Sequence, residues 1–320
     1  MVGDKQIKIS FIVIGRNEGW KLSLCFKSIY KTIDYNKLGD YEIIYVDSKS
    51  TDDSVSRAQA FNEVKIIELK DNKNSAIARN VGAKRSNGSV LFFIDGDMEI
   101  VPSFLPLVYT DSTGLIYDFV SGNFENHFYN TRGELINKNN HYRLSEDEFQ
   151  ITTGGLFLIT KNIWNSINGM NTKYVKCQDL DLGIRLSKKG IKLLRKAEIL
   201  ARHHTIAYTN SDRMWKTLFS NNNFYRIVLL RDHYKYLPYV KLFLRENYTG
   251  VLFFLSLVAS IIHPHLSIYA PYLLITFFRA IVNMKSQFYR IPDRFLYLIL
   301  RDITAFAAIF LFWPETNTEN

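Results

Sequence analysis

Over roughly the first 200 residues, short and almost wholly apolar runs alternate with amphipathic stretches, and this alternation restricts the fold more than any other feature. Runs of four to eight apolar residues are typical of buried strands, and the stretches between them have helical spacing. We therefore predict an α/β fold with a mostly parallel sheet and helices on both faces. The predicted strands span residues 7–15, 41–47, 64–69 and 90–95, and the predicted helices lie within residues 18–33, 51–61 and 74–86.

Local signals refine this prediction. Ser50 is expected to cap the second helix, with Asp53 completing a capping box three residues later. Residues 121–150 are polar and rich in Asn, so we expect an excursion or mobile loop over a site. Residues 178–190 read as a further helix, because acids occupy the first turn, lysines the last, and a glycine follows.

The composition changes after about residue 212, which divides the chain into three predicted parts. Residues 1–211 form the α/β domain. Residues 212–247 interleave Arg and Lys with apolar side chains, a pattern typical of helices in a membrane interface. Residues 248–320 are predicted to form hydrophobic, membrane-associated helices. A soluble helical domain with a very apolar core is the alternative.

Two apolar runs in this last part, 248–263 and 266–284, are each slightly short for a membrane span. Basic residues flank the pair and are absent from the turn between them, so the positive-inside rule places the flanks in the cytosol. A third run, 294–313, contains Arg301 and Asp302 and is either a span with an internal ion pair or an interfacial helix. The start of the chain has no signal-peptide core, so we expect the α/β domain to be cytoplasmic, at the inner (plasma) membrane.

The net charge of +9 favours an anionic partner: nucleic acid, nucleotide phosphates or an anionic membrane face. Nucleic acid is disfavoured, because the basic residues cluster beside the apolar segments rather than in a recognition helix. The two cysteines, Cys25 and Cys177, have no paired spacing, so the sequence supports neither a disulfide framework nor a zinc knuckle.

The strand at 90–95 ends in Asp95, and Gly96 and Asp97 follow. In open α/β sheets ligands bind at the carboxyl ends of the strands. Two carboxylates two residues apart suit a hard divalent cation that also binds phosphate oxygens. The alternative is a surface turn, since Asp-Gly is a common turn dipeptide.

Five segments in order carry a family resemblance: "FIVIGRNEG", "YVDSKSTDDS", "NSAIARNVGAKRSNGSVLFFIDGD", "GGLFLITKNIW" and "QDLDLGIRL". Together they resemble family 2 glycosyltransferases, which are inverting nucleotide-sugar enzymes of GT-A fold. The resemblance covers residues 7 to about 205.

The resemblance implies roles for the residues that match its motifs. Asp47 would hydrogen-bond the nucleotide base, and Asp95 would face the ribose. The side chains expected beside the nucleotide are Glu18, Asp52 and Arg79. Each residue also has a purely structural interpretation. Asp47 would then cap the end of a strand, Glu18 and Asp52 would be acids at the start of a helix, and Arg79 would be an exposed charge on a helix.

The metal and the general base are implied in the same way. Asp97 would bind Mn²⁺ or Mg²⁺ across the diphosphate, with His203 or His204 as a further ligand, and which histidine is left open. Asp179 matches the general base. Gln178 replaces the glutamate that usually precedes the base, and Asp181 is the weaker candidate for its role.

The implied activity is inverting, metal-dependent transfer of a sugar from a nucleoside diphosphate sugar. A UDP-sugar is favoured, with GDP- and dTDP-sugars as alternatives, and the acceptor would be lipid-linked or a glycan at the membrane. No Arg-Trp pair occurs, so the signature of processive synthases is absent. Two other classes stay open: a non-catalytic membrane scaffold of the same fold, and a sugar nucleotidyltransferase, although no Gly-rich phosphate loop is evident.

Overall fold

The computed structural model describes residues 8–70, 74–130, 132–206, 210–220, 222–284 and 288–316, without the side chains of residues 206 and 210–213. The chain divides into two compact units, the first essentially residues 1–207 and the second Tyr208–Glu315. Each unit is described by itself.

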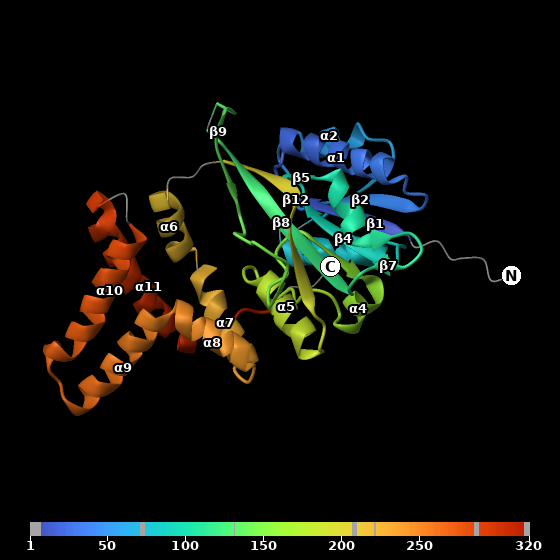
Figure 1. The fold of residues 1–320 in the computed structure, drawn as a ribbon. Coiled ribbons are helices and arrows are strands. Elements are labelled where there is room, and N and C mark those ends of the chain that lie inside the picture. The colour runs from blue at the N-terminus through green and yellow to red at the C-terminus, as the bar shows by residue number, and fades with distance from the viewer. Residues whose placement is uncertain are drawn as a thin grey trace. The chain divides into compact units, whose positions relative to one another are not determined.

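The first unit is built on one large mixed sheet (Figure 1). Its strands are β1 (Ile9–Gly15), β2 (Tyr41–Asp47), β3 (Val64–Glu68), β4 (Val90–Asp95), β5 (Met98–Ile100), β8 (Phe119–Tyr129), β9 (Leu135–Asn140), β10 (Glu148–Gln150), β11 (Phe157–Thr160) and β12 (Leu193–Ile206). The helices are α1 (Trp20–Asn36), α2 (Ser54–Gln59), α3 (Ser75–Arg85), η1 (Pro102–Leu107), α4 (Lys161–Ser166) and α5 (Gln178–Lys188). A small separate ribbon pairs β6 (Tyr109–Thr110) with β7 (Gly114–Leu115).

The strand order is β10-β12-β8-β11-β4-β1-β2-β3. β4, β1, β2 and β3 pair in parallel, β12 is parallel to β8, and β11 runs antiparallel between β4 and β8. Parallel pairing needs crossover helices, which is why the sequence alternates strand and helix. The predicted mixed α/β fold with a mostly parallel central sheet is confirmed.

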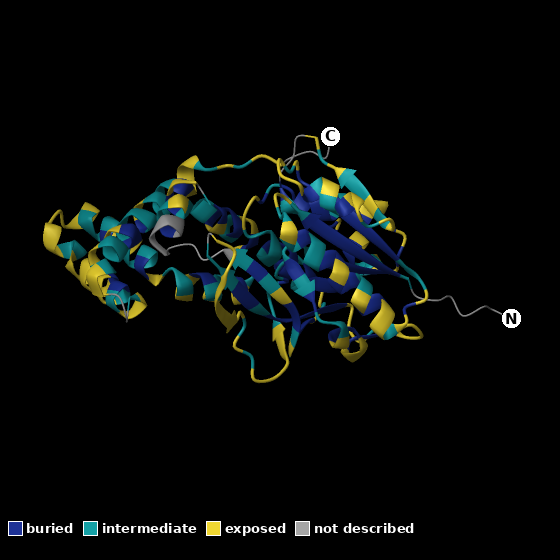
Figure 2. Ribbon diagram, turned by 90° about the horizontal axis from the view of Figure 1, so that it is seen from above, coloured by how far each residue is buried: buried dark blue, intermediate teal, exposed yellow. Residues whose placement is uncertain are grey.

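Both faces of the sheet are covered, as Figure 2 shows by the burial of its strands. Phe11 and Val13 of β1 join one apolar cluster, to which α1 contributes. Ile12 and Ile14, the alternate residues, join a second cluster, to which α3, α4 and α5 contribute. Successive side chains of a strand point to opposite faces, so burial on both faces explains why these strands are apolar throughout.

Two local predictions were wrong. Residues 121–150 do not form a loop, because they include most of β8 and all of β9 and β10, which are strands of the large sheet. Ser50 does not cap α2, which begins at Ser54 after Asp53; its hydroxyl instead donates to Asp47 at 2.5 Å. His203 and His204 both lie within β12.

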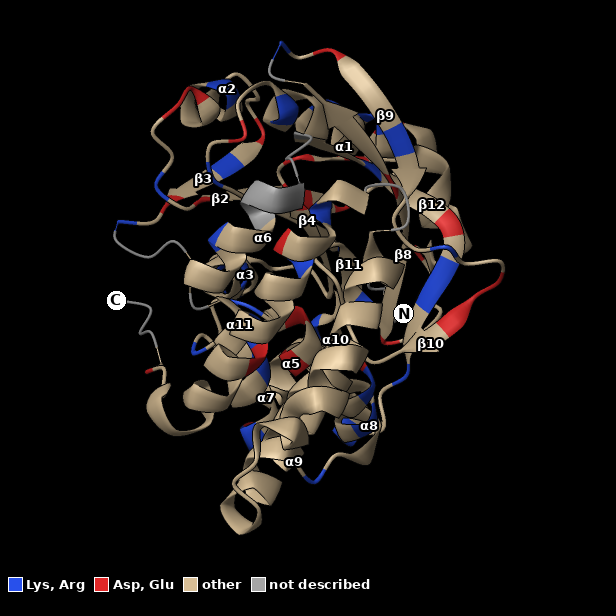
Figure 3. Ribbon diagram, turned by 90° about the vertical axis from the view of Figure 1, so that its left-hand side faces the viewer, with Lys and Arg blue, Asp and Glu red and all other residues tan. Residues whose placement is uncertain are grey.

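The second unit is helical: α6 (Asn210–Phe219), η2 (Asn222–Phe224), α7 (Tyr225–His233), α8 (Leu237–Glu246), α9 (Tyr248–Ile262), η3 (Leu266–Tyr269), α10 (Ala270–Asn283), η4 (Phe288–Arg290) and α11 (Ile291–Leu311). Figure 3 shows how few charged residues α9 and α10 carry.

Among the described residues, one continuous helical segment, Leu266–Asn283, is long and apolar enough to cross a membrane. The bent pair α8 and α9, with 83° between its helices, passes the same test together. Core helices of soluble proteins can meet such a test, so the length and composition of one helix are weak evidence for a membrane.

Candidate active site

The carboxyl ends of β1, β2 and β4 meet at one edge of the sheet, since these strands are parallel and in register there. A cavity of about 370 Å³ opens at this edge. The predicted site residues that line it are Glu18, Arg79, Asp95, Asp97, Asp179 and His203. They come from segments between residues 18 and 203, so only the folded sheet brings them together.

Asp95 and Arg79 form the buried wall of this cavity. Arg79, which is 4% exposed, donates from Nη2 to Asp95 Oδ1 at 2.5 Å and to the Gly155 carbonyl at 3.1 Å. Burial raises the pKa of Asp95, Arg79 opposes this rise, and the charges of Asp97 and Asp179 add to it. The Nε of Arg79 has no partner among the described residues. Arg79 is therefore oriented by Asp95 and holds a positive charge at the buried wall of the cavity.

Asp97 lies beside His203, with 3.1 Å between Asp97 Oδ2 and His203 Nε2. The other ring nitrogen of His203 lies 2.7 Å from Asn126 Oδ1, and the Asn126 amide is fixed by donating to Asn139 at 3.0 Å. Burial lowers the pKa of His203, but the hydrogen bond and charge of Asp97 outweigh it and leave the pKa raised. Nε2 is thus the nitrogen that faces the carboxylate.

This pair fits a divalent cation. Two ligands of an octahedral ion at about 2.1 Å lie about 3.0 Å apart, close to the separation of Asp97 Oδ2 and His203 Nε2. In the described part of the chain, no group of three or more His, Cys, Asp or Glu side chains could hold a metal without other ligands. A cation bound by Asp97 and His203 would therefore take its remaining ligands from substrate phosphates and water, as Mg²⁺ sites commonly do.

Glu18 adds negative charge to the same place. Its carboxylate accepts from Lys21 Nζ at 2.6 Å, and Lys21 also lies 3.8 Å from Asp97. Burial raises the pKa of Glu18, the charge of Asp97 raises it further, and Lys21 opposes both. A carboxylate whose pKa is raised by a neighbouring carboxylate is stabilised when a cation binds between the two, so the surroundings of Glu18 favour binding of a positive ion.

Asp179 stands in the first turn of α5. The Thr152 hydroxyl donates to Asp179 Oδ2 at 3.0 Å, and the Thr153 amide donates to the Asp179 carbonyl at 3.2 Å. Gln178, the residue that departs from the family pattern, donates to the side chain of Asn74 at 2.8 Å. The Thr152 hydroxyl therefore holds the carboxylate of Asp179 at the cavity.

Asp181 is directed elsewhere. It is 2% exposed and accepts from Arg185 at 2.8 Å, one turn later in the same helix. It does not line the cavity, so its geometry does not suit a general base there.

Three of the residues predicted for the site do not line the cavity. Asp47 is buried and accepts from the Tyr45 hydroxyl and the Ser50 amide, both at 2.7 Å, and from the Ser50 hydroxyl at 2.5 Å, so it fixes the loop after β2. Asp52 is exposed and accepts from the Ser54 amide at 3.0 Å. His204 lies on the opposite face of β12 from His203 and contacts Glu99 at 3.1 Å and the Tyr129 hydroxyl at 2.9 Å.

The sequence reasoning missed the side chains that support the site: Lys21, Asn126 and Thr152. Lys21 follows Glu18 by three residues, a helical spacing that could have suggested its ion pair. Nothing local points to Asn126 or Thr152, because their partners lie 77 and 27 residues away in the sequence.

Comparison with known proteins identifies the family of the chain. Residues 10–178 match the family "Glycosyl transferase family 2", which is more than half of the chain. The chain belongs to glycosyl transferase family 2. Glycosyltransferase AglE of Haloferax volcanii is 28% identical over 121 residues, which are 37% of this chain and 39% of that protein. The match therefore spans well under half of that relative.

Among solved structures, the chain is similar to GalNAc-T7 with UDP, GalNAc and Mn²⁺, with 14% identity, a TM-score of 0.47 and coverage of 65% of this chain and 45% of that one. It is also similar to S. aureus TarS 1-349 in complex with UDP, with 13% identity, a TM-score of 0.45 and coverage of 66% and 64%. Because both TM-scores are below 0.5, neither similarity bears on function.

Proposed function

We propose that this family 2 glycosyltransferase moves a sugar from a nucleoside diphosphate sugar to a lipid-linked or glycan acceptor, with inversion at the anomeric carbon. The observation that carries the proposal is the single cavity where Asp97 and His203 lie 3.1 Å apart and Asp179 lines the same space. A scaffold of the same fold would not need this set of side chains. We expect a UDP-sugar as donor, with GDP- and dTDP-sugars as the alternatives.

In the proposed reaction Asp179 is the general base. Its carboxylate takes the proton of the acceptor hydroxyl as that oxygen bonds to the anomeric carbon, and the bond from this carbon to the nucleoside diphosphate breaks. Thr152 keeps the carboxylate in place from one side. A single displacement of this kind converts an α-linked donor into a β-linked product.

The same cavity would hold the donor. Asp97 and His203 would bind Mn²⁺ or Mg²⁺, which when present stabilises negative charge on the departing diphosphate. Arg79, held by Asp95, supplies a fixed positive charge on the buried wall. Asp95 would accept from a ribose hydroxyl, and Glu18 would balance the charge of Lys21 beside the nucleotide.

We further propose that the second unit attaches the enzyme to the cytosolic face of the inner (plasma) membrane. Large apolar side chains are exposed along its helices: Phe254, Leu255, Ile261, Ile262, Leu266, Leu274, Phe278, Val282, Phe310 and Leu311. A soluble helical domain would bury most of them. An enzyme held there would meet lipid-linked acceptors at the level of their head groups.

The first test is nucleotide binding. Thermal unfolding is measured with UDP, GDP, dTDP or CMP, each with Mn²⁺ or with chelator. We expect one nucleotide to raise the melting temperature only with metal, and Asp97→Ala and His203→Gln to abolish the shift. His204→Gln is the matched control, since His204 contacts Glu99 outside the cavity. A shift that survives both cavity variants would refute the proposed cation site.

The second test is catalysis. Asp179→Asn should lower transfer by on the order of 10²–10⁴-fold, the usual contribution of a general base, while nucleotide affinity is kept. Asp34→Asn, an exposed aspartate of α1, is the control for the same chemical change. Full activity of Asp179→Asn, or a product that retains the donor's anomeric configuration, would refute the mechanism.

A further inference from the structure

Arg195 of β12 is the largest fully buried side chain in the described part of the chain, with 1% of its surface exposed. The proposed reaction does not explain its burial, because Arg195 does not line the catalytic cavity. A cation is costly to bury unless hydrogen bonds or an opposite charge compensate for the lost water. The contacts of Arg195 therefore show what its burial accomplishes.

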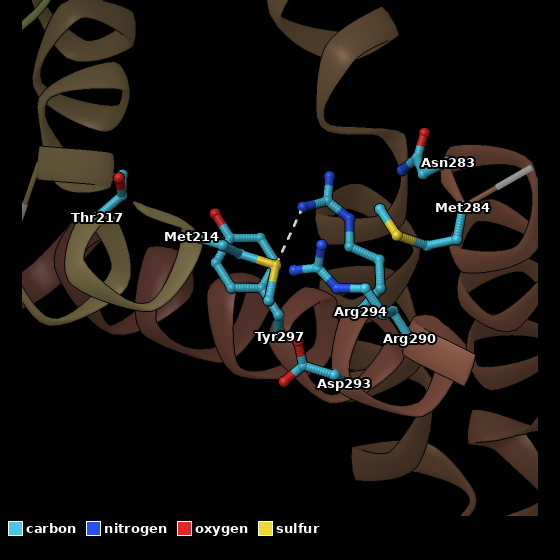
Figure 4. Close-up of a pocket in the computed structure, with 8 residues that line it drawn as sticks. All are labelled: Met214, Thr217, Asn283, Met284, Arg290, Asp293, Arg294 and Tyr297. Atoms are coloured by element: carbon cyan, nitrogen blue, oxygen red, sulfur yellow. Dashed lines mark hydrogen bonds between the residues drawn. The ribbon is translucent and has the colours of Figure 1, made fainter. Parts of the chain in front are cut away.

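Two other arginine sites of the chain include a carboxylate. Arg79 donates to Asp95 at 2.5 Å, and the two arginines that line a cavity of the second unit share its wall with Asp293 (Figure 4). Arg195 differs, because no carboxylate of the described residues lies within 4.0 Å of its guanidinium group. Neutral acceptors and an aromatic ring surround its charge instead.

These acceptors belong to one short segment, residues 150–155, which connects β10 to β11. The Nε of Arg195 donates to the side chain of Gln150 at 2.8 Å, and its Nη2 donates to the Thr152 carbonyl at 3.1 Å. The guanidinium carbon lies 3.8 Å from the centre of the Tyr142 ring. Because a guanidinium group is a rigid planar fork, these contacts fix the segment at two points that are two residues apart.

The same segment is packed against α5, the helix that carries Asp179. A Cβ at Gly183, in the middle of α5, would overlap the Ile151 carbonyl oxygen and lie 3.0 Å from the Cα of Thr152. The Thr152 hydroxyl donates to Asp179 Oδ2 at 3.0 Å, and the Thr153 hydroxyl donates to the Asp179 carbonyl at 3.1 Å. A shift of the segment would therefore move the hydroxyl that holds the proposed base.

The segment ends at the catalytic cavity, which Gly154 lines. A Cβ at Gly154 would lie 3.1 Å from the Tyr142 hydroxyl oxygen and 3.7 Å from two guanidinium nitrogens of Arg195, so both side chains lie directly behind this part of the wall. Burial lowers the pKa of Arg195, whereas the charges of Tyr142 and Asp179 raise it. Attraction between two charges is mutual, so Arg195 also attracts the carboxylate of Asp179.

We propose that Arg195 is a positioning residue for the general base: stacked on Tyr142, it fixes residues 150–155 and thereby the Thr152 hydroxyl that holds the Asp179 carboxylate at the cavity. This inference rests on the proposed function, in which Asp179 is the base. Arg195 itself touches no reacting atom. A lysine would keep the charge but not the two bonds, since an ammonium group lacks the planar fork.

A double-mutant cycle on the full chain tests whether Arg195 acts through Thr152. We expect Arg195→Lys to lower kcat about tenfold, while KM for the donor and nucleotide affinity change by less than about twofold. Thr152→Val should have a similar effect, and the double variant should be little slower than either single variant, because both changes disturb one contact. A loss of about 100-fold in the double variant would show independent effects and overturn the proposal. A kcat of Arg195→Lys within about twofold of the unmodified chain would also overturn it.

Arg185→Lys is the matched control. Arg185 lies on α5 and donates to Asp181 and to two backbone carbonyls outside the catalytic cavity, so its replacement loses a comparable set of bonds. We expect a lower melting temperature but a kcat within about twofold of the unmodified chain. If Arg185→Lys slows the reaction as much as Arg195→Lys does, general loosening of the first unit explains both, and the positioning role is wrong.

A pair of variants at Tyr142 keeps the proposal testable if Arg195→Lys does not fold. Tyr142→Leu removes the ring on which the guanidinium group stacks and should lower kcat severalfold at unchanged nucleotide affinity. Tyr142→Phe keeps the ring and should restore most of the rate. Equal kcat values in these two variants would contradict the role of the stacked pair.

Asp179→Asn, measured in parallel, separates this inference from the proposed function. If Asp179→Asn is inactive while the variants of Arg195 and Tyr142 keep full kcat, the base stands and only the positioning role fails. If Asp179→Asn keeps full activity, Asp179 is not the base, and both proposals fail.

Discussion

Gly155 lies against the ion pair of Asp95 and Arg79, and its replacement by alanine tests whether that pair positions the donor. A Cβ at this position would stand 2.3 Å from Asp95 Oδ2 and 3.2 Å from Arg79 Nη2. Ordinary contacts between such atoms exceed 3 Å, so the carboxylate must move by about 1 Å. The 2.5 Å hydrogen bond between Arg79 and Asp95 would then be broken or bent.

The expected magnitude follows from that bond. A hydrogen bond to a charged group is worth about 1.5–3 kcal/mol, which corresponds to about 10- to 150-fold in an equilibrium constant. Overpacking should also cost about 1–3 kcal/mol of unfolding free energy. We therefore expect Gly155→Ala to remain folded, with a lower melting temperature and nucleotide affinity reduced within that range. Isothermal titration with the nucleotide that stabilises the unmodified chain measures the affinity.

Gly250→Ala is the matched control. A Cβ at Gly250, in α9, would lie 3.5 Å from Asp302, an ordinary contact, so nucleotide affinity should not change. If Gly155→Ala is folded and binds the nucleotide within about twofold of the unmodified chain, the pair of Arg79 and Asp95 does not position the donor, and the reasoning from its geometry is wrong.

Two further perturbations test other contacts. Thr152→Val removes the donor to Asp179 Oδ2 and should lower kcat about tenfold with little change in KM. Thr152→Ser keeps the hydroxyl and should restore the rate. If kcat is unchanged in Thr152→Val, Thr152 has no part in the mechanism. The amide of Asn87 and the side chains of Ser10 and Lys65 oppose the effect of burial and hold the pKa of Glu42 at about 2, against 4.5 for a free glutamate. Because the folded pKa is the lower one, the contribution of Glu42 to stability is full above about pH 5 and is lost by up to about 3 kcal/mol as the pH falls toward 2. Urea unfolding at pH 7 and pH 3 should therefore show a loss of stability that is smaller in Glu42→Gln than in the unmodified chain by about 2 kcal/mol. An equal loss in both chains would contradict this role of Glu42.

The parallel half of the sheet could be predicted from the sequence for a physical reason. Strands β1, β2 and β4 are buried on both faces, so burial alone dictates their residues and the pattern is local. The carboxylates at their ends could be found for the same reason, because a polar residue directly after an apolar run is visible without knowledge of the fold.

β8 could not be predicted in this way, because its buried positions are partly polar. Asn123 and Asn126 are 2% and 8% exposed, yet both are satisfied by hydrogen bonds, Asn123 to Tyr142 and Asn126 to Asn139 and His203. A polar residue predicts exposure until its partners are known, and these partners belong to other strands and loops. The same holds for Thr152, whose acceptor lies on α5.

His203 and His204 show how far the site can be predicted from the sequence. Strand alternation implies that His203 and His204 face opposite sides of the sheet. Which side carries Asp97 depends on the register of β12 against β5 and β8, and that register arises only in the assembled sheet.

The insertion of β12 between β10 and β8 has a consequence for the order of events during synthesis. Asp97 leaves the ribosome more than a hundred residues before His203, and β12 completes the sheet from its interior rather than its edge. A nascent chain that ends before residue 203 lacks half of the proposed cation site, whatever else has folded. Acquisition of metal affinity would therefore mark the closing step of folding of the first unit, and a slow, non-local pairing of this kind is where we expect its rate to be set.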